Sequence, residues 1–178
     1  GRLDYAGIAG LNLGASFFSG NTGQGMRNAA GNAIAARVTL YAAHATLSYK
    51  GFETRGLYAR SSLGDADSLN RVLKLAGNKS LGTEQDGFYL TLGYDVMPLF
   101  MKTAKIALYP FVQYEKLSTQ KKVPSGFALD ASKARTNFTY GFSFKPHPNV
   151  AFKADYVNRK NDAGSGVDQF NLGVTYLY

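Results

Sequence analysis

Hydrophobic and polar residues alternate along most of the chain with a period of two. In the last eleven residues, the apolar or aromatic positions are Phe170, Leu172, Val174, Tyr176 and Tyr178, and the positions between them are polar residues or glycine. A period of two places successive side chains on opposite faces of a β-strand. The pattern therefore predicts a strand that has one apolar face and one polar face.

The same alternation recurs in seven further segments of the chain, which gives eight predicted strands. Two of these segments depart from a simple alternation. The phase slips near Ala42 and Ala43, which predicts a β-bulge, and Pro110 lacks a ladder donor, which predicts a bulge or an unpaired position. The seven segments are residues 11–17, 36–49, 52–62, 88–96, 106–115, 137–144 and 150–159.

Short and long connections between the predicted strands alternate in order along the chain. Bacterial outer-membrane barrels join their strands by short periplasmic turns and longer extracellular loops, so this order is typical of them. In the loop that follows Leu63, Ser68 precedes several apolar residues, which predicts a short capped helix over or inside the mouth of the barrel. The short connections are residues 50–51, 97–103 and 145–149, and the long ones are residues 19–35, 63–86, 118–134 and 160–167.

Residues 2–10 resemble the end of a further strand followed by a short turn. This interpretation predicts a partial ninth strand and makes the chain, a single domain over residues 1–178, the C-terminal part of a larger barrel. The alternative is a flexible N-terminal tail before a self-contained barrel of eight strands. An eight-stranded barrel is filled by side chains, so it would have a structural or adhesive role and would not conduct.

Composition narrows the class of protein further. No stretch reaches the roughly 18 consecutive apolar residues that a transmembrane helix needs, and the chain has no cysteine and no tryptophan. The formal net charge of +8 is scattered, with one local pair at Lys121 and Lys122, so nucleic acid is not an expected partner. Aromatic girdles are expected from Tyr176, Tyr178, Phe144 and Tyr156 at the periplasmic end and from Phe138 or Phe170 at the outer end.

Three segments together resemble the C-terminal half of the Gram-negative porins that are related to the phosphate-selective porins. These segments are GFETRGLYARSSL, YPFVQYEKLSTQKKVPSGFALD and KPHPNVAFKADYVNRKNDAGSGVDQFNLGVTYLY. The resemblance implies a barrel of about sixteen strands, a homotrimer and passive uptake of anions. Gln113 stands where the pattern of that family has an arginine, which argues against selectivity for phosphate.

The leading hypothesis is an outer-membrane porin that passes small anionic or neutral solutes, without catalysis, cofactor or metal. Its weak anion preference would come from charged side chains on the lumen wall; pairing among these charges, which would only stiffen the wall, is the alternative. The predicted pore-lining residues are Lys145, Lys153, Asp155, Arg159, Arg135, Glu115, Gln113, Asp95 and Arg55, with Glu53 beside them.

Two histidines and two aspartates were considered as sites of other chemistry. A lipid hydrolase would need His44 within hydrogen-bond reach of a nucleophile such as Ser48, and the sequence specifies no such geometry. His44 is therefore expected in the lumen or beside a bulge, and His147 in a turn. Asp65 and Asp67 in the long loop are expected to be solvated, with weak calcium binding as the alternative.

Overall fold

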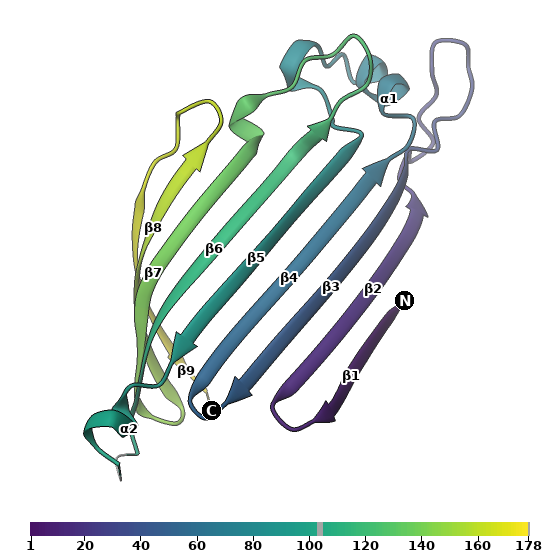
Figure 1. Cartoon of the computed structure of the whole chain (residues 1–178). Helices are drawn as coiled ribbons and strands as arrows, with labels where there is room; N and C mark the ends of the chain where they lie inside the picture. The colour runs from purple at the N-terminus through teal and green to yellow at the C-terminus, as the bar shows by residue number, and fades with distance from the viewer. Residues whose placement is uncertain (103–104, 178) are drawn as a thin grey trace.

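The computed structural model describes residues 1–102 and 105–177 and contains one antiparallel β-sheet of nine strands (Figure 1). The spatial order of the strands is the order of the chain, so every strand pairs with its sequence neighbours. The strands are β1 (Arg2–Ile8), β2 (Leu11–Asn21), β3 (Arg37–Tyr49), β4 (Phe52–Leu63), β5 (Glu84–Tyr94), β6 (Ala107–Lys122), β7 (Ala134–His147), β8 (Val150–Asn161) and β9 (Gln169–Tyr176).

The sheet confirms the predicted all-β antiparallel fold. It also confirms the ninth strand, because β1 pairs with β2 from Arg2–Ser16 to Ile8–Leu11, and a flexible N-terminal tail is therefore wrong. Over the described residues the sheet is open, since β1 pairs only with β2 and β9 pairs only with β8. Tyr178, which was predicted to end the last strand, lies outside the described residues.

The sheet is curved, and its two faces differ in chemistry. Figure 1 looks onto the convex face, with the middle strands nearest the viewer and the edge strands receding. One cavity is lined by residues from β4 through β9, which only the concave side of a curved sheet permits. Glu53, Gln113 and Lys153 line that cavity, so their neighbours in sequence, among them Val112 and Phe152, lie on the convex face.

Strand β3 is regular along its whole length, so the predicted bulge near Ala42 and Ala43 is wrong. Its pairing with β2 and with β4 runs without a shift from residue 37 to residue 49. Alanines lie on both faces here, and Val38 and Leu40 are apolar although they lie on the concave face. The apparent change of phase therefore came from side-chain type and not from the backbone.

Pro110 lies at the point where the pairing of β5 with β6 stops. The last pair is Gly93–Phe111, one residue beyond Pro110, while Pro110 stays in register opposite Phe142 of β7. The missing N–H of proline is tolerated because β5 no longer pairs there. Of the two predicted outcomes, the unpaired position is confirmed, and no bulge occurs at this site.

The connections confirm the predicted alternation: the long loops gather at one end of the sheet and the short turns at the other (Figure 1). Part of the predicted short connection, Thr103, lies outside the described residues. None of the helices in the described part of the chain has the length and hydrophobicity that crossing a membrane requires. The helices are α1 (Ala66–Val72), η1 (Gly77–Lys79), α2 (Met97–Phe100) and η2 (Ala131–Lys133).

Two of the long loops pack together into a small apolar core at the loop end of the sheet. Ile34, Ala36 and Leu69 are buried there. Helix α1 forms in the predicted loop but begins two residues before Ser68, so Ser68 is not its cap. The N-cap is Asp65, at φ 53°, and its carboxylate accepts hydrogen bonds from the backbone N–H groups of Ala35 and Ala36 instead of from its own helix.

The loop that contains α1 is fixed by a fully buried amide, that of Asn70. Its Nδ2 donates to the carbonyl oxygen of Leu81 at 3.1 Å, and its Oδ1 accepts from the N–H of Leu81 at 2.7 Å. Gln120 of β6 ties the same loop to its neighbour, because it donates to the carbonyl oxygen of Asn78 and accepts from the N–H of Asp130. These hydrogen bonds therefore hold the long loops at this end of the sheet in a defined conformation.

Replacing Asn70 with alanine is expected to loosen this loop locally. The substitution removes the partners of the N–H and C=O of Leu81, which are partly shielded from water, at a cost of about 1–3 kcal/mol. The exchange protection of the Leu81 amide should fall by about 5- to 150-fold in hydrogen–deuterium exchange, with little change in the strands. Asn78→Ala, at an exposed side chain of the same loop, is the control; equal loss of protection in both variants would contradict the role of Asn70.

Candidate functional site

A groove lined largely by polar side chains lies on the concave face and has a volume of about 760 Å³. The strands β4 to β9 place side chains there because every second residue of each strand points to this face. Five of the predicted pore-lining residues line the groove, and Glu53 joins them as predicted. The five are Arg55, Gln113, Glu115, Lys145 and Lys153.

Asp155 lies at the edge of this groove and is held by two partners. Its Oδ2 lies 3.1 Å from Lys153 Nζ, and its Oδ1 accepts a hydrogen bond of 2.8 Å from Asn171 Nδ2 of β9. Asp155 is only 7% exposed because it fills the space that Gly141 leaves open across the strand pair. A Cβ on Gly141 would lie 2.7 Å from Asp155 Cα, so glycine is required for this packing.

Aromatic rings on the concave face support the lysines of the groove. Lys145 Nζ lies 4.7 Å from the ring centre of Tyr109, and Lys153 Nζ lies 4.9 Å from that of Phe111. Rings at this distance attract a cation through their quadrupole. The sequence analysis missed these two rings and Tyr89, which also lines the groove.

Hydrogen bonds between neighbouring strands fix the side chains of Gln113 and Glu115 in the groove. The hydroxyl of Thr91 donates to Gln113 Oε1 at 2.8 Å, and Asn137 Nδ2 donates to Glu115 Oε1 at 2.5 Å. The groove thus combines three cationic side chains with three carboxylates, counting Asp155 at its edge. Among the described residues, the only ion pair within this set joins Lys153 to Asp155, so Lys145 and Arg55 keep their charge available to a solute.

The other predicted pore-lining residues lie away from the groove. Arg135 and Arg159 are on the concave face nearer the long loops, where Arg135 pairs with Asn161 and Arg159 with Asn137. Asp95 follows the last residue of β5, and its carboxylate accepts from the N–H groups of Met97 and Leu108. Asp95 therefore holds the turn between β5 and β6.

A second polar cluster lies on the concave face near the free edge of the sheet. Arg2 Nε donates to Asp4 Oδ2 at 2.7 Å, and Asp4 Oδ1 lies 3.5 Å from His44 Nε2. Gly14 lies opposite both, and a Cβ there would lie 2.1 Å from His44 Cε1. His44 thus lies on the concave face, and its lumenal position stays a prediction; its neighbours Asp4 and Arg2, each with an atom 3.5 Å from Nε2, were not identified in the sequence analysis.

The geometry does not assemble the hydrolase pair that was considered for His44. Ser48 lies four residues further along the same strand, which is about 13 Å at the rise of a β-strand, against the roughly 3 Å that a nucleophile and its base require. His147, which was predicted in a turn, is the last residue of β7, where it pairs with Val150 next to the turn of residues 148–149, and its Nδ1 accepts from the N–H of Asn149.

The loop aspartates form contacts within the protein. Asp65 caps α1 and Asp67 pairs with Arg71 at 2.9 Å. Across residues 1–102 and 105–177, no group of three or more histidine, aspartate or glutamate side chains is arranged to hold a metal ion.

On the convex face, aromatic side chains form two belts separated by apolar residues. The loop-side belt and the turn-side belt are four to eight residues apart along a strand, which is about 13–27 Å. The loop-side belt is Phe17, Tyr41, Tyr58, Phe88, Tyr114, Phe138, Tyr140, Tyr156 and Phe170, and the turn-side belt is Tyr49, Phe52, Tyr94, Phe144, Phe152 and Tyr176.

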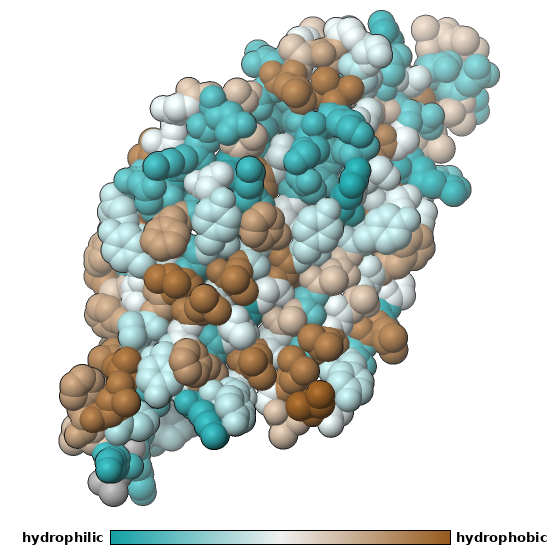
Figure 2. Space-filling view, viewed as in Figure 1, coloured by the Kyte–Doolittle hydropathy of each residue, from teal (hydrophilic) through white to brown (hydrophobic). Residues whose placement is uncertain are grey.

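The belts correct the prediction for one ring. Tyr156 was expected at the same end as Phe144, but it lies opposite Tyr140 and Phe170 in the loop-side belt. Its hydroxyl donates to Asp168, which precedes β9 at the loop end of the sheet. Figure 2 shows hydrophilic residues gathered beyond this belt, toward the loops, and apolar residues over the rest of the convex face.

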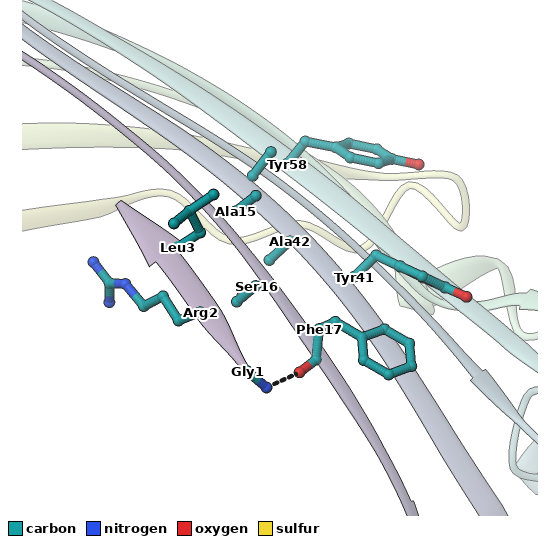
Figure 3. Close-up of a pocket in the computed structure, with 10 residues that line it drawn as sticks. Gly1, Arg2, Leu3, Ala15, Ser16, Phe17, Tyr41, Ala42 and Tyr58 are labelled. Atoms are coloured by element: carbon teal, nitrogen blue, oxygen red, sulfur yellow. Dashed lines mark hydrogen bonds between the residues drawn. The ribbon is translucent and has the colours of Figure 1, made fainter. Parts of the chain in front are cut away.

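The free edge at β1 shows the two faces side by side (Figure 3). The backbone amine of Gly1 donates to the carbonyl oxygen of Phe17 at 2.7 Å, where the pairing of β1 begins. Leu3 and Ala15 point to one side of the sheet and Arg2 points to the other. The separation of apolar and charged side chains therefore extends to the edge strand.

Comparisons find known proteins that are similar to this chain in sequence and in structure. An uncharacterized protein of Aquifex aeolicus (strain VF5) is 30% identical over 183 residues, which covers all of this chain and 40% of that protein. The chain thus spans about 40% of the length of this relative. The solved backbone structure of the Yersinia pestis outer membrane protein Ail, in a phospholipid bilayer nanodisc, aligns with 91% of this chain and 97% of that one, at 18% identity and a TM-score of 0.33. No protein-family profile matches the chain.

Proposed function

We propose that the chain forms part of the wall of a bacterial outer-membrane porin that passes small anionic or neutral solutes by diffusion. The observation that carries the proposal is the division of one curved sheet into two surfaces. Its convex face is apolar between two aromatic belts, and its concave face carries the groove with Arg55, Lys145 and Lys153. A β-sheet that faces lipid on one side and water on the other has this arrangement.

Closure of the sheet into a larger barrel is part of the proposal. In a bilayer, unpaired backbone groups at the edges of a sheet cost several kcal/mol each, so a spanning sheet must close. The nine strands leave the edges β1 and β9 for further strands to pair with. A barrel of about sixteen strands satisfies both edges, and its bore is wide enough for a water-filled channel.

The weak anion preference follows from the charges of the concave face. The groove itself holds three cationic side chains and three carboxylates, counting Asp155 at its edge. Arg135 and Arg159 add two positive charges to the concave face, and the residues opposite them in the pairing of β7 with β8 are asparagines and not carboxylates. The wall is then modestly positive, which favours anions in the bore. Gln113, held by Thr91, presents an amide in place of a further charge.

Planar-bilayer recording on the full-length protein tests the function. The expected result is a conductance that appears in steps and is proportional to the applied voltage. In a salt gradient, the reversal potential should lie slightly on the side of the equilibrium potential of the anion. Far-ultraviolet circular dichroism on the same preparation verifies that the strands have formed. A folded, membrane-inserted protein that gives no conductance steps would refute the porin.

A further inference from the structure

A row of cationic and hydroxyl side chains crosses the convex face directly beyond the loop-side belt. Lys116 of β6 lies opposite Thr136 of β7, which lies opposite Lys160 of β8. All three point to the convex face, because each lies an even number of residues from a belt residue of its own strand: two from Tyr114, two from Phe138 and four from Tyr156. The strand spacing of about 4.8 Å places the Cα atoms of the two lysines about 10 Å apart.

Two of the carboxylates near this row, those of Glu84 and Asp86, are paired with other cations, and a third, that of Asp168, accepts hydrogen bonds from Tyr156, Asn158 and the backbone of Arg159. Glu84 lies 2.6 Å from Arg60 Nη2 and 2.8 Å from Lys122 Nζ, and Asp86 lies 3.3 Å from Lys121 Nζ.

Lys116 and Lys160, by contrast, are exposed. Neither has a carboxylate within 4 Å among the described residues. The row therefore presents two available ammonium groups with a hydroxyl between them.

A hollow of about 590 Å³ includes Lys116 of the row and extends from it toward the loops. Ser118 of β6 and Asp130 and Asp162 of two loops line it, together with apolar residues such as Leu117 and Leu129. Hydroxyl and carboxylate groups beside apolar side chains in a shallow hollow suit a sugar, whose hydroxyls and ring carbons they can contact. A phosphate held by the lysines and a sugar in the hollow would belong to one molecule.

We propose that Lys116, Thr136 and Lys160 bind a phosphate group of the glycolipid of the outer leaflet, with its sugar in the adjoining hollow. The proposal rests on the membrane orientation in the proposed function. Aromatic belts lie at headgroup depth, and long loops mark the external side of a barrel, so the row lies where outer-leaflet phosphates lie. Lysine binds phosphate as a point charge, and a threonine hydroxyl adds a hydrogen bond.

The test is a lipid-binding titration of the full-length protein in detergent, read by native mass spectrometry. The probes are bisphosphorylated lipid A, its dephosphorylated form and phosphatidylglycerol. The variant Lys116→Gln with Lys160→Gln should bind bisphosphorylated lipid A about ten- to thirtyfold more weakly than the native protein. Lys116→Arg with Lys160→Arg should restore binding, and the dephosphorylated lipid should bind weakly to every form.

A matched control removes the same charge from the concave face. Lys145→Gln with Lys153→Gln should leave lipid A binding unchanged. Equal losses in both double variants, or no loss in the first, would overturn the site. Phosphatidylglycerol that binds as tightly as lipid A and loses as much affinity would overturn the assignment to a glycolipid.

Conductance on the same preparations separates this proposal from the proposed function. A protein that conducts normally but binds lipid A independently of Lys116 and Lys160 refutes the lipid site and leaves the pore intact. A folded protein that binds lipid A through these lysines without conducting refutes the pore and leaves the lipid site intact.

Discussion

Replacing Lys145 and Lys153 together by glutamate is expected to reverse the ion preference of the channel from weakly anionic to cationic. Each substitution exchanges a positive for a negative charge at the wall of the groove, where both ammonium groups lie over aromatic rings. One unit charge at 4 Å in water is worth about 1 kcal/mol, a factor of about five in local ion concentration. The chloride-to-potassium permeability ratio should therefore fall by about fivefold or more at 0.1 M salt.

Reversal potentials in a salt gradient measure this ratio. The difference in reversal potential between the variant and the native protein should be smaller at 1 M salt than at 0.1 M salt, because the Debye length falls from about 10 Å to about 3 Å. Lys116→Glu with Lys160→Glu makes the same change of charge on the convex face, and it should leave the ratio near that of the native protein. If the groove variant keeps the native reversal potential in both salts, Lys145 and Lys153 do not border the path of the ions.

The alternation of residues along each strand predicted which face of the sheet each charged residue occupies. Residues with the same parity, meaning an even number of positions apart in one strand, point to the same face. The pairing of each strand with the next preserves parity, so Arg55, Gln113, Glu115 and Lys153 lie together on one face although they come from different strands. An alternating sequence carries this information locally. The face of a residue therefore follows from its own segment once that segment forms a strand.

Depth in the sheet could not be predicted in the same way. The height of Tyr156 depends on its pairing with Tyr140 and Phe170, which is a relation between strands that no single segment contains. The position of Asp95 likewise depends on where β5 stops pairing. The size of the closed barrel also depends on relations between strands, and it stays a prediction.

Parity also failed where both faces are apolar. From Leu108 to Val112 every residue is apolar, aromatic or proline, so the rings of Tyr109 and Phe111 were hidden among residues of the opposite face. The cap of α1 was missed for a different reason. Asp65 binds the backbone of Ala35 and Ala36, some thirty residues earlier, and this contact forms only when the two loops meet.

Placing an arginine at Val112 is expected to destabilise the folded protein in a bilayer by about 2–4 kcal/mol, the cost of arginine on the lipid face at the bilayer midplane. Val112 lies on the convex face between the two belts, opposite Leu92 and Tyr140. Its side chain is 41% exposed on the sheet, so lipid is the expected neighbour. Refolding into phosphatidylcholine vesicles against urea, followed by the gel shift between folded and unfolded bands, gives the free energy.

The adjacent substitution Gln113→Arg is the control, since it adds the same side chain to the same strand one residue further on. Gln113 faces the groove and loses only its bond from Thr91, a cost of about 0.5–1.5 kcal/mol. An arginine there stays in water and adds a positive charge to the wall. The cost at Val112 should therefore exceed the cost at Gln113 by about 0.5–3.5 kcal/mol, because exposing an arginine to lipid costs more than the loss of one hydrogen bond. Equal costs, or a larger cost at Gln113, would mean that the convex face does not contact hydrocarbon, and the membrane orientation of the sheet would have to be abandoned.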